Sequence, residues 1–137
     1  MLPEKIAEVR EWVQKAAEDL GVAEHILSAK LPYFGPVLFH CQQAAEEMLK
    51  AYLIWHDQPF RKTHELEVLL TACTKIDQGF STLVPAAKSL TRYAVDQRYP
   101  GSGGKPNLRE TEDALVLARG IYDFVLGYLP PDVKPRT

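Results

Sequence analysis

The residues of this sequence best suited to bind a phosphate group are Lys62, His64 and Arg98. Arg98 comes at the predicted end of a helix, just ahead of a proline, where its guanidinium can leave the helix axis and bind two phosphate oxygens at once. Lys62 and His64 bracket the predicted start of another helix, whose first backbone amides are free to bind an anion. Tyr93 and Tyr99 are candidates to stack on a nucleobase. These residues together predict a site for a nucleotide or another phosphate-bearing ligand.

The same residues also have a purely structural interpretation, which the sequence leaves open. In it Arg98 pairs with a carboxylate, His64 only opens its helix, and the tyrosines pack. Gln42 and Glu46 lie one turn apart on a predicted helix among apolar positions such as Phe39, so each should find a polar partner. We expect Arg98 to pair with Glu46, either within one chain or between two protomers that meet across this face.

Other chemistries are disfavoured by the spacing of the residues that they need. Residues 101–105 read Gly-Ser-Gly-Gly-Lys, but a phosphate loop requires a glycine in place of Tyr99 and a serine or threonine in place of Pro106. We therefore expect a flexible loop, in which Lys105 is still able to hold an anion. Helical metal sites use Glu-x-x-His pairs, and none occurs, so neither a metal nor a cofactor is expected.

Helical periodicity is the dominant pattern in the chain. Apolar residues recur at steps of three and four from Ile6 to Leu27, which predicts a first helix with one buried face. A third helix is predicted over 64–75, capped by the Thr63 hydroxyl, and a fourth from a Ser81 cap to near residues 99–101. The last is predicted over 107–129, because Asn107 and Glu110 have the spacing of a capping box.

The second predicted helix, over 37–56, is apolar around most of its circumference and is therefore expected to be central. Its polar residues are predicted to form a narrow arc that faces solvent. They are His40, Gln43, Glu47 and Lys50.

Composition is typical of one globular domain. The chain has 137 residues, 46% of them hydrophobic and 25% charged, and a net charge of −2, so it does not attract polyanions as a whole. No strand pattern or membrane-spanning stretch is apparent. We predict an all-α, antiparallel up-and-down bundle of four to five helices, with a core over about 4–129 and a frayed tail over 130–137. Cys41 and Cys73 are predicted to fill the core, and a reducing, cytoplasmic location is expected.

Three segments together resemble the HEPN domain, the higher-eukaryote and prokaryote nucleotide-binding family. They are residues 39–53 (FHCQQAAEEMLKAYL), 62–66 (KTHEL) and 90–100 (LTRYAVDQRYP), in the order and at the separations of that family. The resemblance extends over about 9–129. It implies a helical bundle that is usually a homodimer and is frequently encoded beside a minimal nucleotidyltransferase, with which it forms a toxin–antitoxin-like pair.

Many HEPN proteins are metal-independent ribonucleases, in which an arginine is followed by four to six residues and then a histidine. This sequence departs from that motif, because no histidine follows Arg98 and the spacing from Arg61 to His64 is too short. The resemblance is closer to the branch with an Arg-Tyr-Pro sequence, which the family name associates with nucleotide binding.

Three functions therefore remain open. We favour a non-enzymatic binding module, a homodimer that holds a nucleotide near Lys62, His64 and Arg98 and acts with a nucleotidyltransferase partner. The second is a ribonuclease toxin in which His64 and Arg98 act on RNA without the usual spacing. The third is a helical dimerisation adaptor that has no ligand.

Overall fold

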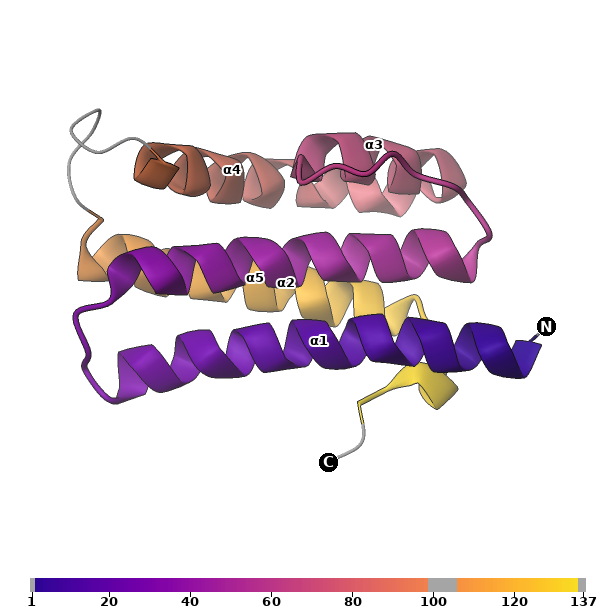
Figure 1. Ribbon diagram of the computed structural model, residues 1–137. Helices are drawn as coiled ribbons and strands as arrows, with labels where there is room; N and C mark the ends of the chain where they lie inside the picture. The colour runs from indigo at the N-terminus through magenta and orange to yellow at the C-terminus, as the bar shows by residue number, and fades with distance from the viewer. Residues whose placement is uncertain (1, 99–105, 136–137) are drawn as a thin grey trace.

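The chain is all-helical. The computed structural model describes residues 2–98 and 106–135, and the side chains of 2–94 and 106–135. These residues form five α-helices and two short 3-10 helices, and no strand occurs among them (Figure 1). The predicted all-α class is confirmed.

The first two helices form an antiparallel hairpin. Helix α1 covers Leu2–Ser28 and α2 covers Phe34–Trp55. The apolar stripe predicted for α1 is buried, because Val9, Val13 and Leu20 are all at most 1% exposed. In Figure 1 the two helices lie side by side along most of their length.

Helix α2 is the central helix, as its all-round apolar character predicts. It packs against each of the other four α-helices, with α1 on one side and the shorter α3 and α4 on the other (Figure 1). The prediction of a solvent-facing polar arc on α2 is wrong for two of its residues. Glu47 is 1% exposed and Lys50 is 7% exposed. Since helices cover α2 from several sides, these polar side chains lie inside the bundle.

The third helix begins later than predicted. Helix α3 covers Leu66–Ile76, and the Thr63 hydroxyl accepts a hydrogen bond from the Glu65 amide at 3.1 Å, so it closes a turn ahead of the helix. Glu65 occupies the N-cap position without making a side-chain cap. Two residues that were expected to be helical, His64 and Glu65, therefore form an irregular segment together with Thr63.

The Ser81 cap is likewise wrong. A 3-10 helix, η1, covers Gln78–Leu83, and it is the Asp77 carboxylate that accepts a hydrogen bond from the Gly79 amide, at 2.8 Å. Helix α4 follows over Val84–Arg98. Its second residue is Pro85, in the first turn, where no backbone amide is needed.

Helix α5 covers Leu108–Gly127 and begins with the predicted capping box. The Asn107 side chain accepts a hydrogen bond from the Glu110 amide at 2.8 Å, and the Glu110 carboxylate accepts one from the Asn107 amide at 3.1 Å. This local signal is read correctly from sequence because both partners lie within one turn.

The predicted frayed tail is wrong for its first residues. Pro131–Val133 form a second 3-10 helix, η2, which packs against α1. Val133 is fully buried, and the Arg10 guanidinium donates hydrogen bonds to the Asp132 carbonyl, from Nε at 3.0 Å. An apolar side chain thus anchors the chain beyond α5.

The core includes an aromatic cluster around Phe80, which is fully buried. Its ring centroid lies 4.3 Å from that of Tyr52, 5.2 Å from that of Phe124 and 5.1 Å from that of Tyr128. This cluster joins η1 to α2 and α5. None of the helices over 2–98 and 108–127 combines the length with the apolar character needed to cross a membrane.

Candidate functional site

His64 is held by a buried carboxylate. It lies in the segment between α2 and α3, and its Nδ1 is 3.0 Å from Oε1 of Glu46 and 3.2 Å from Oε2. The His64 side chain is 75% exposed, whereas that of Glu46 is only 4% exposed. An ionised carboxylate only accepts hydrogen bonds, so Nδ1 of His64 carries the hydrogen and donates the hydrogen bond to Glu46. The other ring nitrogen, Nε2, is thereby left for a ligand.

The partner of Glu46 within the bundle is Lys50. The Lys50 ammonium lies 2.9 Å from Oε2 of Glu46, one helical turn away. It also lies over two aromatic rings, 5.7 Å from the centroid of Trp12 and 5.8 Å from that of Phe60. The expectation that Glu46 has a polar partner is met by this buried ion pair together with His64, and the Arg98 side chain lies outside the described residues.

A second polar cluster lies between α1 and α2. Nδ1 of His40 is 2.7 Å from Oδ1 of Asp19, and Nζ of Lys15 is 3.8 Å from Oε2 of Glu47. Oε1 of Glu47 has no hydrogen-bond partner within the described part of the chain. Burial, and then the neighbouring Asp19 carboxylate, raise the pKa of Glu47 from 4.5 to about 9, although Lys15 opposes the shift. Glu47 is therefore protonated at neutral pH.

This raised pKa has a definite consequence for stability. An acid with a higher pKa in the folded than in the unfolded chain stabilises the fold fully only below its unfolded pKa, here 4.5. The contribution of Glu47 falls as the pH rises above that value and is lost by about pH 9.

Two adjoining pockets open beside His64. The first, here called the Phe39 pocket, has a volume of about 470 Å³ and is lined by Gly35, Phe39, Gln42, Glu46, His64 and Ala94 among others. The second, here called the Lys62 pocket, has a volume of about 570 Å³ and is lined by Gln42, Lys62, His64, Glu65, Thr91 and Ala94 among others. Three residues line both pockets: Gln42, His64 and Ala94.

Gln42 stands at the junction of the two pockets. Its Nε2 donates a hydrogen bond to the His64 carbonyl at 3.4 Å, which ties α2 to the segment before α3. Its Oε1 has no hydrogen-bond partner among the described residues, and neither has Oγ1 of Thr91 across the Lys62 pocket. Both oxygens are buried beneath the surface, so a ligand reaches either of them only after its side chain moves.

The structure brings Lys62 and His64 together beside the start of α3, where the sequence places them. Both line the Lys62 pocket, and α3 begins there without a side-chain cap. Glu65 and Glu67 line the same pocket with exposed side chains. The pocket therefore combines one ammonium, one imidazole and a helix start with two carboxylates at its solvent side.

Of the predicted stacking tyrosines and the Arg98 guanidinium, only Tyr93 has a described side chain. Tyr93 is half-buried, packs against the core and has the Arg92 guanidinium 6.0 Å from its ring centroid, and it lines neither pocket. The main chain of Arg98 ends α4, four residues after Ala94. The Arg98 side chain and all of Tyr99 lie outside the described residues, as does the segment 101–105.

Sequence reasoning missed Lys50 and Phe39. Lys50 follows Glu46 by four residues, the spacing of a helical ion pair, so a signal for this contact was present. Phe39 was expected to pack inside, but it is 57% exposed and lines the pocket that bears its name. No pattern in the sequence marks it, because an exposed and a buried phenylalanine look alike.

Comparison with known proteins identifies the fold and the family. A family model of the HEPN domain matches residues 9–128, which is most of the chain. The chain belongs to the HEPN domain family. The crystal structure of ST0689, an archaeal HEPN homologue, superposes on this HEPN domain with a TM-score of 0.68 at 24% identity, covering 88% of this chain and 96% of the other. No curated protein matches the sequence.

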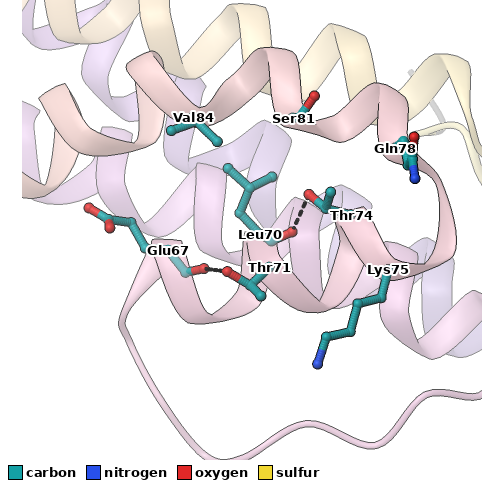
Figure 2. Close-up of a pocket in the computed structure, with 8 residues that line it drawn as sticks. All are labelled: Glu67, Leu70, Thr71, Thr74, Lys75, Gln78, Ser81 and Val84. Atoms are coloured by element: carbon teal, nitrogen blue, oxygen red, sulfur yellow. Dashed lines mark hydrogen bonds between the residues drawn. The ribbon is translucent and has the colours of Figure 1, made fainter.

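A further pocket of this HEPN domain, about 590 Å³ in volume, lies between α3 and the η1–α4 segment (Figure 2). The hydroxyls of its two threonines are already used, because Thr71 donates to the Glu67 carbonyl and Thr74 to the Leu70 carbonyl, each at 2.8 Å. Figure 2 shows the Lys75 side chain extending away from Ser81 and Val84. Although it is the larger pocket, it offers less chemistry than the pair beside His64.

The cysteines of the HEPN domain are core residues, as predicted. Cys41 and Cys73 are both fully buried, and neither forms a disulfide. Burial raises the pKa of each thiol to about 12, so neither is a thiolate at neutral pH. Across the described residues, no group of three or more histidine, cysteine, aspartate or glutamate side chains is arranged to hold a metal ion.

Proposed function

We propose that this HEPN domain is a non-enzymatic binding module for a phosphate-bearing nucleotide. The observation that carries the proposal is the Lys62 pocket, where an ammonium, an oriented imidazole and the start of α3 line one space. Each of these groups favours an anion: Lys62 by its charge, and the first amides of α3 by the hydrogen bonds that no side chain takes up. Arg98 is proposed as a further phosphate ligand.

The position of Arg98 along α4 supports its proposed role as a phosphate ligand. Positions four apart share one face of a helix. Position 98 therefore falls on the same face of α4 as Ala94, which lines both pockets. Thr91, three residues before Ala94, lines the Lys62 pocket as well. The end of α4 therefore runs along the proposed phosphate site.

The charge of the surrounding carboxylates does not prevent this binding. Glu46 is the acid that contacts His64, and its charge is compensated within the bundle by Lys50 at 2.9 Å. Glu65 and Glu67 are exposed, so water and salt screen them. The buried part of the site is therefore close to neutral before Lys62 and Arg98 are counted.

Thermal unfolding with a panel of nucleoside mono-, di- and triphosphates tests the proposal. A ligand that binds only the folded chain at about 100 times its Kd stabilises it by about 2.7 kcal/mol, so the midpoint should rise. Lys62→Ala and Arg98→Ala should each remove the rise, whereas Lys88→Ala, an exposed lysine on α4, should keep it. Unchanged midpoints with every nucleotide would count against the binding module and favour the adaptor.

We propose further that the domain acts as a homodimer with a minimal nucleotidyltransferase in a toxin–antitoxin-like pair, and that it works in the cytoplasm. Family membership supports this part of the proposal. Light scattering on the purified protein should give twice the mass of one chain, and a co-expressed nucleotidyltransferase should co-purify with it. A monomer that captures no such partner would overturn this part while leaving nucleotide binding to its own test.

A metal-independent ribonuclease is the second candidate, and the contact between Glu46 and His64 favours it. A carboxylate that fixes the proton on Nδ1 leaves Nε2 ready to accept one, which is what a general base requires. Incubation of RNA with the protein and a metal chelator tests this activity. Cleavage that His64→Ala abolishes would support it, and intact RNA would exclude it.

A further inference from the structure

We infer that the ligand of this site is a mononucleotide whose base lies in the Phe39 pocket and whose phosphate lies in the Lys62 pocket. The inference rests on the proposed function and assigns a residue to each part of the ligand. Phe39 takes the base, Gln42 the ribose, and Lys62 with His64 the phosphate. A bare phosphate or a polyphosphate would fill only the Lys62 pocket.

The ring of Phe39 stands beside an open, apolar space. This side chain is 57% exposed on a helix that is otherwise the most buried of the bundle. Its ring meets that of His40 edge to face, with centroids 5.4 Å apart, which orients it. The other apolar lining residues are Gly35 and Ala94, whose small size leaves space for a flat ring. Proteins stack nucleobases on exposed aromatic rings of this kind, and such stacking does not distinguish between the bases.

The two pockets differ in the groups that they present. Lys62 lines only its own pocket, and Phe39 lines only the other. A ligand that uses both residues should therefore have one apolar aromatic end and one anionic end. A nucleoside monophosphate has that division.

Gln42 lies at the junction of the two pockets and lines both, so it stands beside the middle of any ligand that fills them together. In a nucleotide the ribose lies between base and phosphate, and its hydroxyls both donate and accept. The order Phe39, Gln42, Lys62 thus matches the order base, ribose, phosphate.

Each pocket also has the right size. Volumes of about 470 Å³ and about 570 Å³ fall within the range of small-molecule sites, and the two are joined through Gln42, His64 and Ala94. Tyr93, the stacking candidate suggested by the sequence, packs against the core and lines neither. Phe39 takes the stacking role in its place.

Isothermal titration with the four common nucleoside 5′-monophosphates and with ribose 5-phosphate tests the inference. Stacking on one base is worth about 1–3 kcal/mol, so the tightest nucleotide should bind at least about five-fold more tightly than ribose 5-phosphate. Phe39→Ala should abolish this ratio and leave the affinity for ribose 5-phosphate unchanged. Phe39→Tyr should keep the ratio.

Tyr33→Ala is the matched control, because Tyr33 is 56% exposed at the N-cap of the same helix and lines neither pocket. It should leave the ratio unchanged. Circular dichroism and light scattering on each variant confirm that the fold and the mass are retained. A Phe39→Ala protein with a changed mass and an unchanged ratio would identify Phe39 as a subunit contact and overturn the inference.

The two proposals fail in different ways. Equal affinities for ribose 5-phosphate and the tightest nucleotide would overturn the assignment of the base to Phe39 and leave phosphate binding intact. No binding of either ligand would overturn the proposed function and this inference with it. Weakened binding of both ligands in Lys62→Ala, at an unchanged ratio, is the result expected when both proposals hold.

Discussion

Replacing Glu46 with alanine should destabilise the bundle strongly, because the buried ammonium of Lys50 would lose its counter-ion. Glu46 is 3% exposed and Lys50 is 7% exposed, and their charged atoms are 2.9 Å apart. Removing one partner of a buried ion pair costs about 3–5 kcal/mol. The rings of Trp12 and Phe60 compensate part of this loss, since a desolvated cation over an aromatic ring gains up to about 2 kcal/mol. We therefore expect a loss near the lower limit, about 3 kcal/mol.

The hydrogen bond from His64 contributes less to this loss. The imidazole is 75% exposed, so water replaces the carboxylate readily, and exposed pairs contribute about 1 kcal/mol or less. His64→Ala should accordingly lower the free energy of unfolding by no more than about 1 kcal/mol. The difference between the two variants isolates the part that belongs to Lys50.

Equilibrium unfolding in urea is the assay, with Glu46→Ala, Lys50→Met and the double variant arranged as a double-mutant cycle. Methionine removes the charge and keeps most of the volume of the lysine stem. The double variant should therefore be more stable than Glu46→Ala alone, by about 2 kcal/mol, because it leaves no unpaired buried charge. Glu65→Ala, at an exposed carboxylate of the same site, is the control and should stay within about 0.5 kcal/mol of wild type.

Two results would refute this reasoning. One is a Glu46→Ala protein as stable as the Glu65→Ala control, which would mean that Lys50 reaches solvent and needs no counter-ion. The other is a double variant less stable than both single variants, which would mean that packing around the two side chains, and not charge, accounts for the loss.

Three further outcomes are expected. We expect wild type to lose stability between about pH 6 and pH 8, by up to about 1.4 kcal/mol per pH unit, because the pKa of Glu47 is raised, and Glu47→Gln should abolish this loss. Urea unfolding at several pH values measures how the free energy of unfolding changes with pH. Glu18→Gln, at an exposed site, should keep the wild-type change. The same change in Glu47→Gln would contradict its assignment to Glu47. Phe80→Ala should cost about 3–5 kcal/mol in the same assay, since a ring packed against three others leaves a cavity, and a loss below about 1 kcal/mol would show that the cluster collapses around it. Asn107→Ala should lower the thermal midpoint through a loss of about 1 kcal/mol from the capping box of α5, and an unchanged midpoint would mean that the helix start is not stabilised by its cap.

Several predictions that rest on neighbouring residues agree with the structure, although the Thr63 and Ser81 caps do not. The buried stripe of α1 and the capping box at Asn107 each depend on partners within one or two helical turns. The central position of α2 also follows from its sequence, because a helix that is apolar around most of its surface must be covered by other helices. These elements together determine the all-α class.

Predictions that depend on contacts distant in sequence are less accurate. Val133, which was expected in a frayed tail, is buried because α1 offers it a place to pack. The polar arc of α2 shows the same limit. Glu47 and Lys50 look solvent-facing on a helical wheel, but the wheel does not show that α1 brings Lys15 and Trp12 to that side.

The amino-acid sequence by itself determined the all-α class, the central role of α2 and the family resemblance, and it suggested Lys62 and His64 as candidate site residues. Those conclusions come from local periodicity and from short motifs, which the order of residues states directly. Only the tertiary structure decided that Glu46 holds His64 and pairs with Lys50, that Phe39 stands exposed in a pocket, and that Tyr93 does not line it. These facts depend on how α2 sits against α1, α3 and α4, because burial and hydrogen bonding are properties of packed helices and not of single ones.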